Sequence, residues 1–217
     1  MEREATEPVT REILDMEWEM FHAVQGIDGP ASCQEDRDTF EVMRSSQLLA
    51  WTEEIAESYL DDLKRAKAAG RNLMTEKYAR MMEYTSPCEF RRIAPNLPAL
   101  DKHAMPLIER LSHMSVGWME ELAAKYPHVG AQGRPIRNSG DSAHTPSFET
   151  YNRGELATYS VKTLRLLEEH YLKMTAAGTS PAEVILRNAV ARYGYASLEQ
   201  AETAQKARAE KRRGSEV

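Results

Sequence analysis

An arginine and a glutamine interrupt an apolar stripe in the segment from Glu35 to Ala69. With about 100° of turn per helical residue, Arg44 and Gln47 fall on its apolar side. That side is otherwise formed by Phe40, Met43, Trp51 and Ile55. A buried guanidinium needs partners, because an unpaired charge inside a protein is strongly destabilising. Either Arg44 forms a structural bridge to a carboxylate of a neighbouring helix, or Arg44 and Gln47, beside Trp51, bind an anionic group of a ligand through a bidentate fork.

A second set of reactive side chains lies in the segment from Ser147 to Ala177. Tyr151, Glu155 and Tyr159 share one helical face, about 100° from the leucine-rich side of that helix. A carboxylate between two phenols could act as a general base if partial burial raised its pKa. The alternative is a solvated edge, along which amphipathic side chains cover apolar surface.

The stretch from Tyr126 to Thr145 separates these helical patterns from each other. It contains three glycines and two prolines, has no helical periodicity, and carries the basic residues Arg134 and Arg137. Structureless loops of this length are uncommon in compact domains and are usually functional or disordered. We therefore expect a long Gly/Pro-rich loop that folds over the polar side chains of the helices.

Together these segments suggest an enzyme that binds a small carboxylate-bearing, amino-acid-like substrate. Arginines would hold the anionic ligand, and Glu155 or a tyrosine would move a proton. The residues assigned to substrate binding are Arg44, Gln47, Trp51, Arg134 and Arg137, and those assigned to catalysis are Glu155, Tyr159 and Tyr151. The rival hypothesis is a non-catalytic module in which the same loop and stripe bind another protein, or a second copy of the chain in a homodimer.

Metal and cofactor motifs give little support to other chemistries. Di-iron helical bundles use two Glu-x-x-His pairs, whereas Glu19-Met-Phe-His22 is the only such pair in a predicted helix. Neither cysteine has a partner at zinc spacing, and the glycine-rich phosphate-binding motifs do not occur. We expect no metal and no cofactor. Lys77, Tyr78, Glu83 and Tyr84 either line a pocket or are surface residues of their helix.

Composition and periodicity predict an all-α protein, a compact multi-helix bundle in one domain. The 217 residues are 41% hydrophobic and 29% charged, which is typical of a globular chain. The segment from Glu35 to Ala69 is apolar on two sides, so we expect it to form one long central helix. The expected organisation is a disordered N-terminus over residues 1–9, a helical domain over 10–204 and a frayed tail over 205–217.

Capping patterns and periodicity predict where the other helices begin and end. Ser86-Pro-Cys-Glu89 and Ser180-Pro-Ala-Glu183 have the form of capping boxes. The remaining helices are expected near Thr10 to Gly26, Leu73 to Tyr84, Leu100 to Lys125, Ser147 to Ala177, and from Ser197 onward.

Charge and hydropathy exclude several classes of partner. A net charge of −6 disfavours nucleic-acid binding, and no apolar run approaches the length of a membrane span. The acidic N-terminal sequence is unlike a secretory signal, so we expect a cytoplasmic protein. The cysteines Cys33 and Cys88 are expected to be free thiols in a reducing compartment.

Several separate motifs, in the same order, resemble a bacterial family catalogued as domain of unknown function 4125. The resemblance covers about Thr10 to Glu202 and implies a bacterial source, but no activity. It is carried by Ala31-Ser-Cys-Gln-Glu-Asp-Arg-Asp-Thr-Phe40, Gly70-Arg-Asn-Leu-Met-Thr-Glu-Lys-Tyr78, Gly133-Arg-Pro-Ile-Arg137, Ser147-Phe-Glu-Thr-Tyr-Asn-Arg-Gly-Glu-Leu-Ala-Thr-Tyr-Ser160 and Tyr193-Gly-Tyr-Ala-Ser-Leu198.

Overall fold

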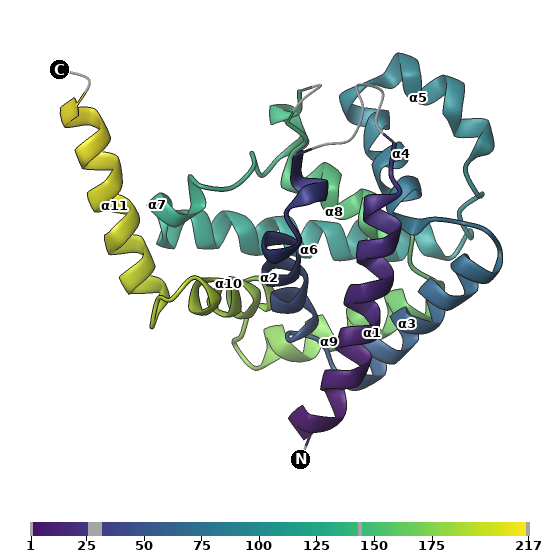
Figure 1. Cartoon of the computed structure of the whole chain (residues 1–217), viewed down its shortest axis with the longest axis horizontal. Coiled ribbons are helices and arrows are strands. Elements are labelled where there is room, and N and C mark those ends of the chain that lie inside the picture. Colours follow the sequence, from purple (N-terminus) through teal and green to yellow (C-terminus); the bar gives the residue numbers. More distant parts are fainter. Residues whose placement is uncertain (1, 26–31, 143–144, 216–217) are drawn as a thin grey trace.

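The protein is all-α, as the composition predicts (Figure 1). The computed structural model describes residues 2–25, 32–142 and 145–215, and these ranges contain no β-strand. Side chains are described from residue 8, apart from residues 32, 33, 214 and 215, so the predicted state of Cys33 lies outside the described side chains. Cys88 is a free, exposed thiol.

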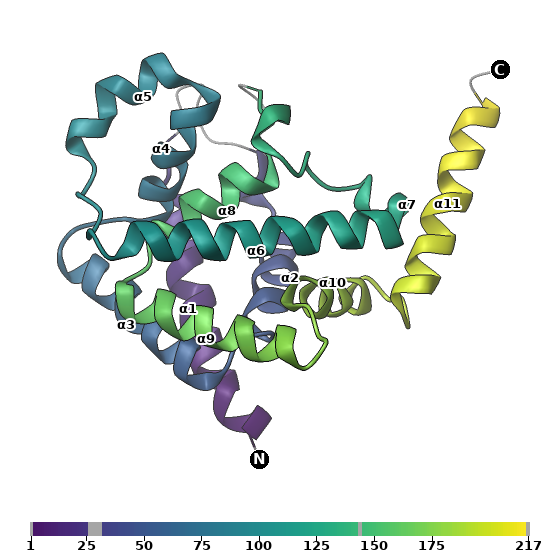
Figure 2. The same ribbon diagram turned by 180° about the vertical axis from the view of Figure 1, so that it is seen from behind.

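The helices form one main core and a smaller second one. The main core lies between α1, α2, α3, α4, α6, α8 and α9, while the second joins the end of α6 to α10 and α11. Figure 2 shows α6 running across the body in front of α1 and α2. The bounds are α1 Glu2–His22, α2 Arg37–Leu48, α3 Glu53–Ala68, α4 Leu73–Thr85, α5 Pro87–Ile93, α6 Ala104–Lys125, α7 Pro127–Gly130, α8 Phe148–Leu156, α9 Val161–Ala176, α10 Pro181–Arg192 and α11 Leu198–Ser215.

The long central helix expected over Glu35 to Ala69 is wrong, because the chain turns between α2 and α3. Thr52 begins a new helix at this turn, because its hydroxyl accepts a hydrogen bond from the Ile55 amide at 3.4 Å and caps α3. The turn buries Trp51, whose side chain enters the main core. Among the residues that the structure describes, the longest helix is instead α6, with 22 residues, which packs against α7, α8, α9 and α10.

The helix expected from Ser147 to Ala177 is also two helices, α8 and α9. Ser160 caps α9, and Asp62 of α3 stabilises the turn by accepting bonds from the Ser160 amide at 2.9 Å and the Thr163 hydroxyl at 2.6 Å. The break therefore depends on a carboxylate that is distant in sequence. This contact explains why local periodicity alone predicts a continuous helix.

Several helix boundaries differ from the expected ones by a few residues. The first helix begins at Glu2 instead of near Thr10, and α6 begins at Ala104 instead of Leu100. The capping box at Ser180 forms, with the Glu183 amide 3.3 Å from the Ser180 hydroxyl. Ser86 precedes α5 as expected, but its side chain makes no capping bond.

The Gly/Pro-rich segment before α8 is tied to the body. Its first residues form the short helix α7, and beyond it the described part contains one 3₁₀ turn, Asn138–Gly140. Backbone amides of Phe148 and Glu149 donate to the carbonyls of Pro135 and Ile136 at 2.8 and 3.0 Å.

Over the described residues, no helix combines the length and apolar character needed to span a bilayer.

Helices α4 and α8 approach each other closely at Gly154. A Cβ at Gly154 would lie 2.8 Å from Met81 Cγ and 3.0 Å from the carbonyl oxygen of Lys77. Because a carbonyl belongs to the rigid α4 backbone, a side chain there would push the two helices apart. Glycine at this position thus sets the distance between Lys77 and the residues of α8.

Gly154→Ala should lower the free energy of unfolding by about 1–3 kcal/mol, because the added methyl group overpacks the α4–α8 contact. The matched control is Gly117→Ala within α6, where a Cβ would meet nothing within 4 Å. That change should stabilise the protein by up to about 1 kcal/mol through helix propensity. Urea denaturation of the three proteins measures both effects, and equal stability of Gly154→Ala and wild type would contradict the close approach.

Candidate functional site

Arg44 lies inside the protein and is bound on two sides by carboxylates. Only 7% of the surface of Arg44 is exposed to solvent. Nε and Nη2 donate to the two Glu17 oxygens at 2.7 and 2.6 Å, and Nη1 donates to Glu155 Oε1 at 2.8 Å and to Gln47 Oε1 at 2.6 Å. These bonds occupy four of the five N–H groups of the guanidinium. The structural bridge expected for Arg44 therefore exists, with a carboxylate from α1 and another from α8.

Glu155 is the second centre of the site. Lys77 Nζ donates to Glu155 Oε2 at 2.6 Å, and Tyr159 Oη donates to Oε1 at 2.7 Å. The amide of Gln47 donates to the same Oε1 at 3.1 Å. Glu155 and Lys77 are 5% and 2% exposed, so this carboxylate and this ammonium are both held out of water.

Glu17, Arg44, Lys77 and Glu155 form what we call the buried charge cluster. Two carboxylates balance two cations, and the four side chains come from α1, α2, α4 and α8. Tyr59 of α3 adds a hydrogen bond from its hydroxyl to Glu17 Oε1 at 2.5 Å. The cluster therefore connects five helices through charge-assisted bonds.

Aromatic rings line one side of the cluster. The two helix breaks place Trp51 and Tyr159 edge to face, with ring centroids 6.1 Å apart. The ring of Tyr59 lies 5.6 Å from Trp51 and 4.8 Å from Tyr159. The predicted site residues Arg44, Gln47, Trp51, Glu155 and Tyr159 are thus in one place.

The surroundings keep the carboxylate of Glu155 ionised. Burial alone would raise its pKa, but the charges of Arg44 and Lys77 and the hydrogen bonds from Lys77 and Tyr159 lower that pKa far below its usual range. Burial and the nearby carboxylates raise the pKa values of Tyr59 and Tyr159 well above that of a free phenol. The direction for Glu155 is opposite to the one expected of a general base, and both phenols remain hydrogen-bond donors.

Tyr151 connects the cluster to the molecular surface. It is half-buried, with Lys77 Nζ 3.6 Å from its ring centroid and Arg134 Cζ 5.1 Å from the same centroid. Arg134 is exposed and donates to the carbonyl of Pro146 at 3.3 Å. Arg137 lies elsewhere, because both of its bonds, at 2.6 Å, go to Glu120 of α6. Of the two loop arginines, Arg134 is the one next to the predicted site.

Glu17, Tyr59 and the role of Lys77 are not among the features predicted from the sequence. Glu17 lies in an apolar stripe of α1 between Ile13 and Met20, the same signal that singled out Arg44. The sequence leaves Lys77 either lining a pocket or at the surface, and in the structure it is buried. Tyr84, considered with it, is exposed.

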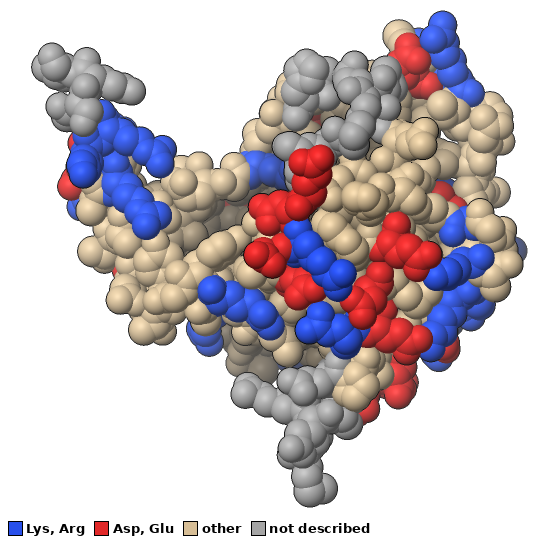
Figure 3. All heavy atoms as spheres, in the orientation of Figure 1, with Lys and Arg blue, Asp and Glu red and all other residues tan. Residues whose placement is uncertain are grey.

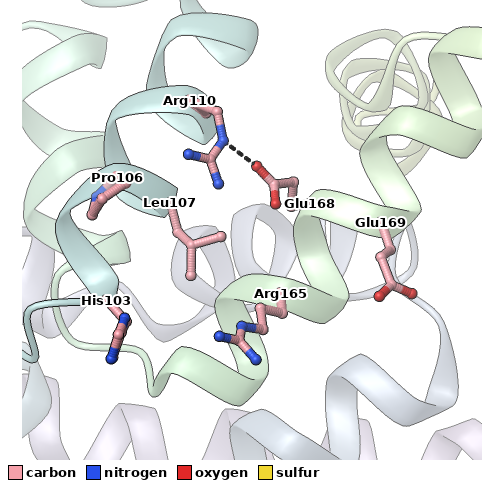
Figure 4. Close-up of a pocket in the computed structure, with 7 residues that line it drawn as sticks. All are labelled: His103, Pro106, Leu107, Arg110, Arg165, Glu168 and Glu169. Carbon is pink, nitrogen blue, oxygen red and sulfur yellow. Dashed lines mark hydrogen bonds and ion pairs between the residues drawn. The ribbon is translucent and has the colours of Figure 1, made fainter.

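A separate open groove of about 380 Å³ lies between α6 and α9 (Figure 4). Leu107 lies between two charged ends: Arg110 turns toward Glu168, with Nε 2.5 Å from Oε1, and Arg165 and His103 are on the other side. The complete lining is His103, Pro106, Leu107, Arg110, Arg165, Glu168 and Glu169. Its mixed charge would suit a small zwitterion, and it shares no residue with the buried charge cluster.

Arg44→Lys should lower the free energy of unfolding by about 2–4 kcal/mol. One ammonium group cannot reach Glu17 in a bidentate fork and Glu155 as well, so charge-assisted bonds are lost inside the core. The control is Arg37→Lys on the same helix, where Arg37 is exposed and pairs with Asp15 and Glu41. Its cost should stay below about 1 kcal/mol, as for other surface pairs. Equal costs for the two variants in urea denaturation would contradict the burial of Arg44.

The lowered pKa of Glu155 makes the protein sensitive to acid. Its contribution to stability is present above the pKa of an unfolded glutamate, about 4.3, and is lost as the pH falls toward the folded pKa. Glu155→Gln should therefore be less stable than wild type at pH 7, and the difference should shrink from about pH 5 to pH 3. Glu121→Gln, an exposed change on α6, should follow the wild-type pH dependence. An undiminished difference at pH 3 would count against an ionised Glu155.

The chain matches the family model described as protein of unknown function (DUF4125) over residues 7–203. No curated protein and no solved structure matches the chain. The match covers most of the 217 residues and includes every residue of the buried charge cluster. The chain therefore belongs to the DUF4125 family.

Proposed function

We propose that this domain binds a small carboxylate-bearing molecule, such as an amino acid, on the outer side of the buried charge cluster. The observation that carries the proposal is the convergence at one place of side chains from three distant segments. Arg44 and Glu155 are 111 positions apart and 2.8 Å apart in space. Arg134, from the loop, lies over Tyr151 at the edge of the same cluster.

The cost of burying four charges supports a role beyond folding. Buried ion pairs contribute little net stability, and apolar residues of similar volume often serve a fold equally well. Groups with strongly shifted pKa values also tend to gather at functional sites. The cluster borders two half-buried side chains, Tyr151 and Gln47, and has the composition of a binding site that is held rigid before the ligand arrives.

Each residue has a distinct role in the proposal. Arg134, with a single carbonyl as its hydrogen-bond acceptor in the described residues, would clamp the ligand carboxylate. Tyr151 would offer its ring to the apolar or cationic part of the ligand. Lys77, behind that ring, would add positive potential, while Arg44 and Gln47 keep Glu155 in place.

The pKa directions change the proposed role of two predicted catalytic residues. A carboxylate with a strongly lowered pKa is a weak base, so Glu155 suits the positioning of Lys77 better than proton abstraction. Tyr159, with a raised pKa, suits donation of a hydrogen bond to Glu155. The proposed function is therefore ligand binding, and neither Glu155 nor Tyr159 is assigned a proton-transfer step.

We further propose a bacterial, cytoplasmic setting without nucleic-acid partners. The resemblance to bacterial sequences, the free thiol of Cys88 and the net charge of −6 support this setting. A second candidate function, protein interaction, is favoured by one specific observation, the projecting basic end of α11.

A thermal-shift screen with small carboxylates, amino acids and inorganic phosphate tests the ligand proposal. At least one carboxylate should raise the Tm of wild type. Arg134→Ala should weaken binding of that carboxylate by about 1–3 kcal/mol, which is roughly fivefold to 150-fold in Kd. Arg137→Ala is the matched control, because it removes the same charge from the same loop but only breaks the pair with Glu120.

The outcomes separate this site from the groove between α6 and α9. Loss of the response in Arg165→Ala, with Arg134→Ala unchanged, would move the ligand to that groove and contradict the proposal. So would equal responses from Arg134→Ala and Arg137→Ala, or no response from wild type to any compound.

A further inference from the structure

The first turns of α11 are firmly attached to the body. Leu198 and Ala201 are buried in the second core. Tyr126 Oη donates to Glu199 Oε1 at 2.7 Å, and the backbone amides of His128 and Val129 donate to the Glu202 carboxylate at 3.0 and 2.9 Å. The direction of the helix is therefore fixed at its base.

The distal part of α11 leaves the body and is strongly basic. Residues 206–213, which we call the α11 arm, carry Lys206, Arg208, Lys211, Arg212 and Arg213 against the single acid Glu210. This gives the arm a formal charge of +4 within a chain of −6, so the remainder carries −10. Figure 3 shows these Lys and Arg side chains gathered on the projecting helix, clear of the body.

The composition of the arm indicates contact with something outside the described fold. Basic residues in the last turn of a helix are stabilised by the negative end of the helix dipole. Lys206 and Arg208 come well before that turn, so the dipole does not account for them. Arg208, Lys211 and Arg212 share about 100° of one face. Within the described residues, Arg208 and Arg212 have no ion-pair partner. Like charges this close repel each other unless a partner supplies opposite charge.

A complementary acidic surface lies on α3. Glu53, Glu54, Glu57 and Asp61, which we call the α3 stripe, are all exposed and fall within about 100° of the helix. None of them forms an ion pair with another described residue. Glu53 and Glu54 are stabilised by the positive N-terminal end of the α3 dipole, whereas Glu57 and Asp61 lie beyond the first turn. The stripe is about 12 Å long and the arm about 10 Å, at 1.5 Å per residue.

The arm and the stripe of one chain are too far apart to meet. Figures 1 and 2 place α11 and α3 at opposite ends of the body, and the base of α11 is fixed there. We propose that the α11 arm docks on the α3 stripe of a second copy of this chain. If two bodies lie antiparallel, each arm meets the partner's stripe, and the two equivalent contacts close a twofold dimer.

The contact is electrostatic, so its strength depends on salt. Exposed ion pairs are individually weak, and several acting together steer association that weakens as the ionic strength rises. The proposal is independent of ligand binding, because neither the arm nor the stripe includes a residue of the buried charge cluster. A failure of one proposal therefore leaves the other intact.

Sedimentation velocity of the full chain at about 20 mM and about 500 mM salt tests the dimer. We expect a dimer at low salt and a monomer at high salt. Arg208→Glu with Arg212→Glu, and separately Glu57→Lys with Asp61→Lys, should each weaken the dimer at least tenfold at low salt. A chain that carries all four changes should regain part of the lost affinity, because the four reversed side chains again carry opposite charges across the contact.

The control reverses another basic pair, Arg91→Glu with Arg92→Glu on α5, and should leave association unchanged. Thermal unfolding of each variant checks that the fold is retained. A monomer under all conditions, a dimer insensitive to salt, or no recovery in the fourfold variant would overturn the proposal. Arm-dependent binding of polyglutamate by a monomeric wild type would assign the arm to an acidic partner protein and also overturn it.

Discussion

The burial of the Arg44 guanidinium is the constraint on which the other features of the fold depend. Once this cation is inside, Glu17 and Glu155 have to reach it, and α1, α2 and α8 therefore meet at one point. Two carboxylates around one cation would leave a negative charge in the core, which Lys77 neutralises from α4. The Lys77–Glu155 bond in turn requires α4 and α8 to lie close together, and Gly154 allows that approach.

The two helix breaks both place aromatic side chains beside the buried charge cluster. A straight helix through residues 37–68 or 148–176 would carry its later turns away from the cluster. The turns at Trp51 and Tyr159 instead bring two aromatic side chains edge to face beside the charges. Asp62 stabilises the second turn by accepting hydrogen bonds from the backbone amide of Ser160 and the side chain of Thr163. Aromatic packing thus excludes water from the ions and strengthens their attraction.

How much of this could be predicted depends on how local each cause is. Apolar periodicity and the cap at Ser180 are local, so most helices and the all-α class follow from the sequence. The stripe on α2 also predicts that Arg44 is buried and paired. The breaks at Thr52 and Ser160 interrupt continuous apolar patterns, and the second depends on Asp62, almost 100 positions away. The partner Glu17 could not be chosen over other carboxylates, because the choice depends on how α1 and α2 pack.

A double-mutant cycle tests whether charge balance around Arg44 organises the core. Arg44→Met leaves two carboxylates against one cation, and Glu17→Leu leaves two cations against one carboxylate. Each should cost about 3–5 kcal/mol of unfolding free energy, as expected for a broken buried pair. The double variant keeps Lys77 paired with Glu155 and restores balance, so urea denaturation should show it losing far less than the sum of the single losses. Additive losses would show that charge balance around Arg44 does not organise the core.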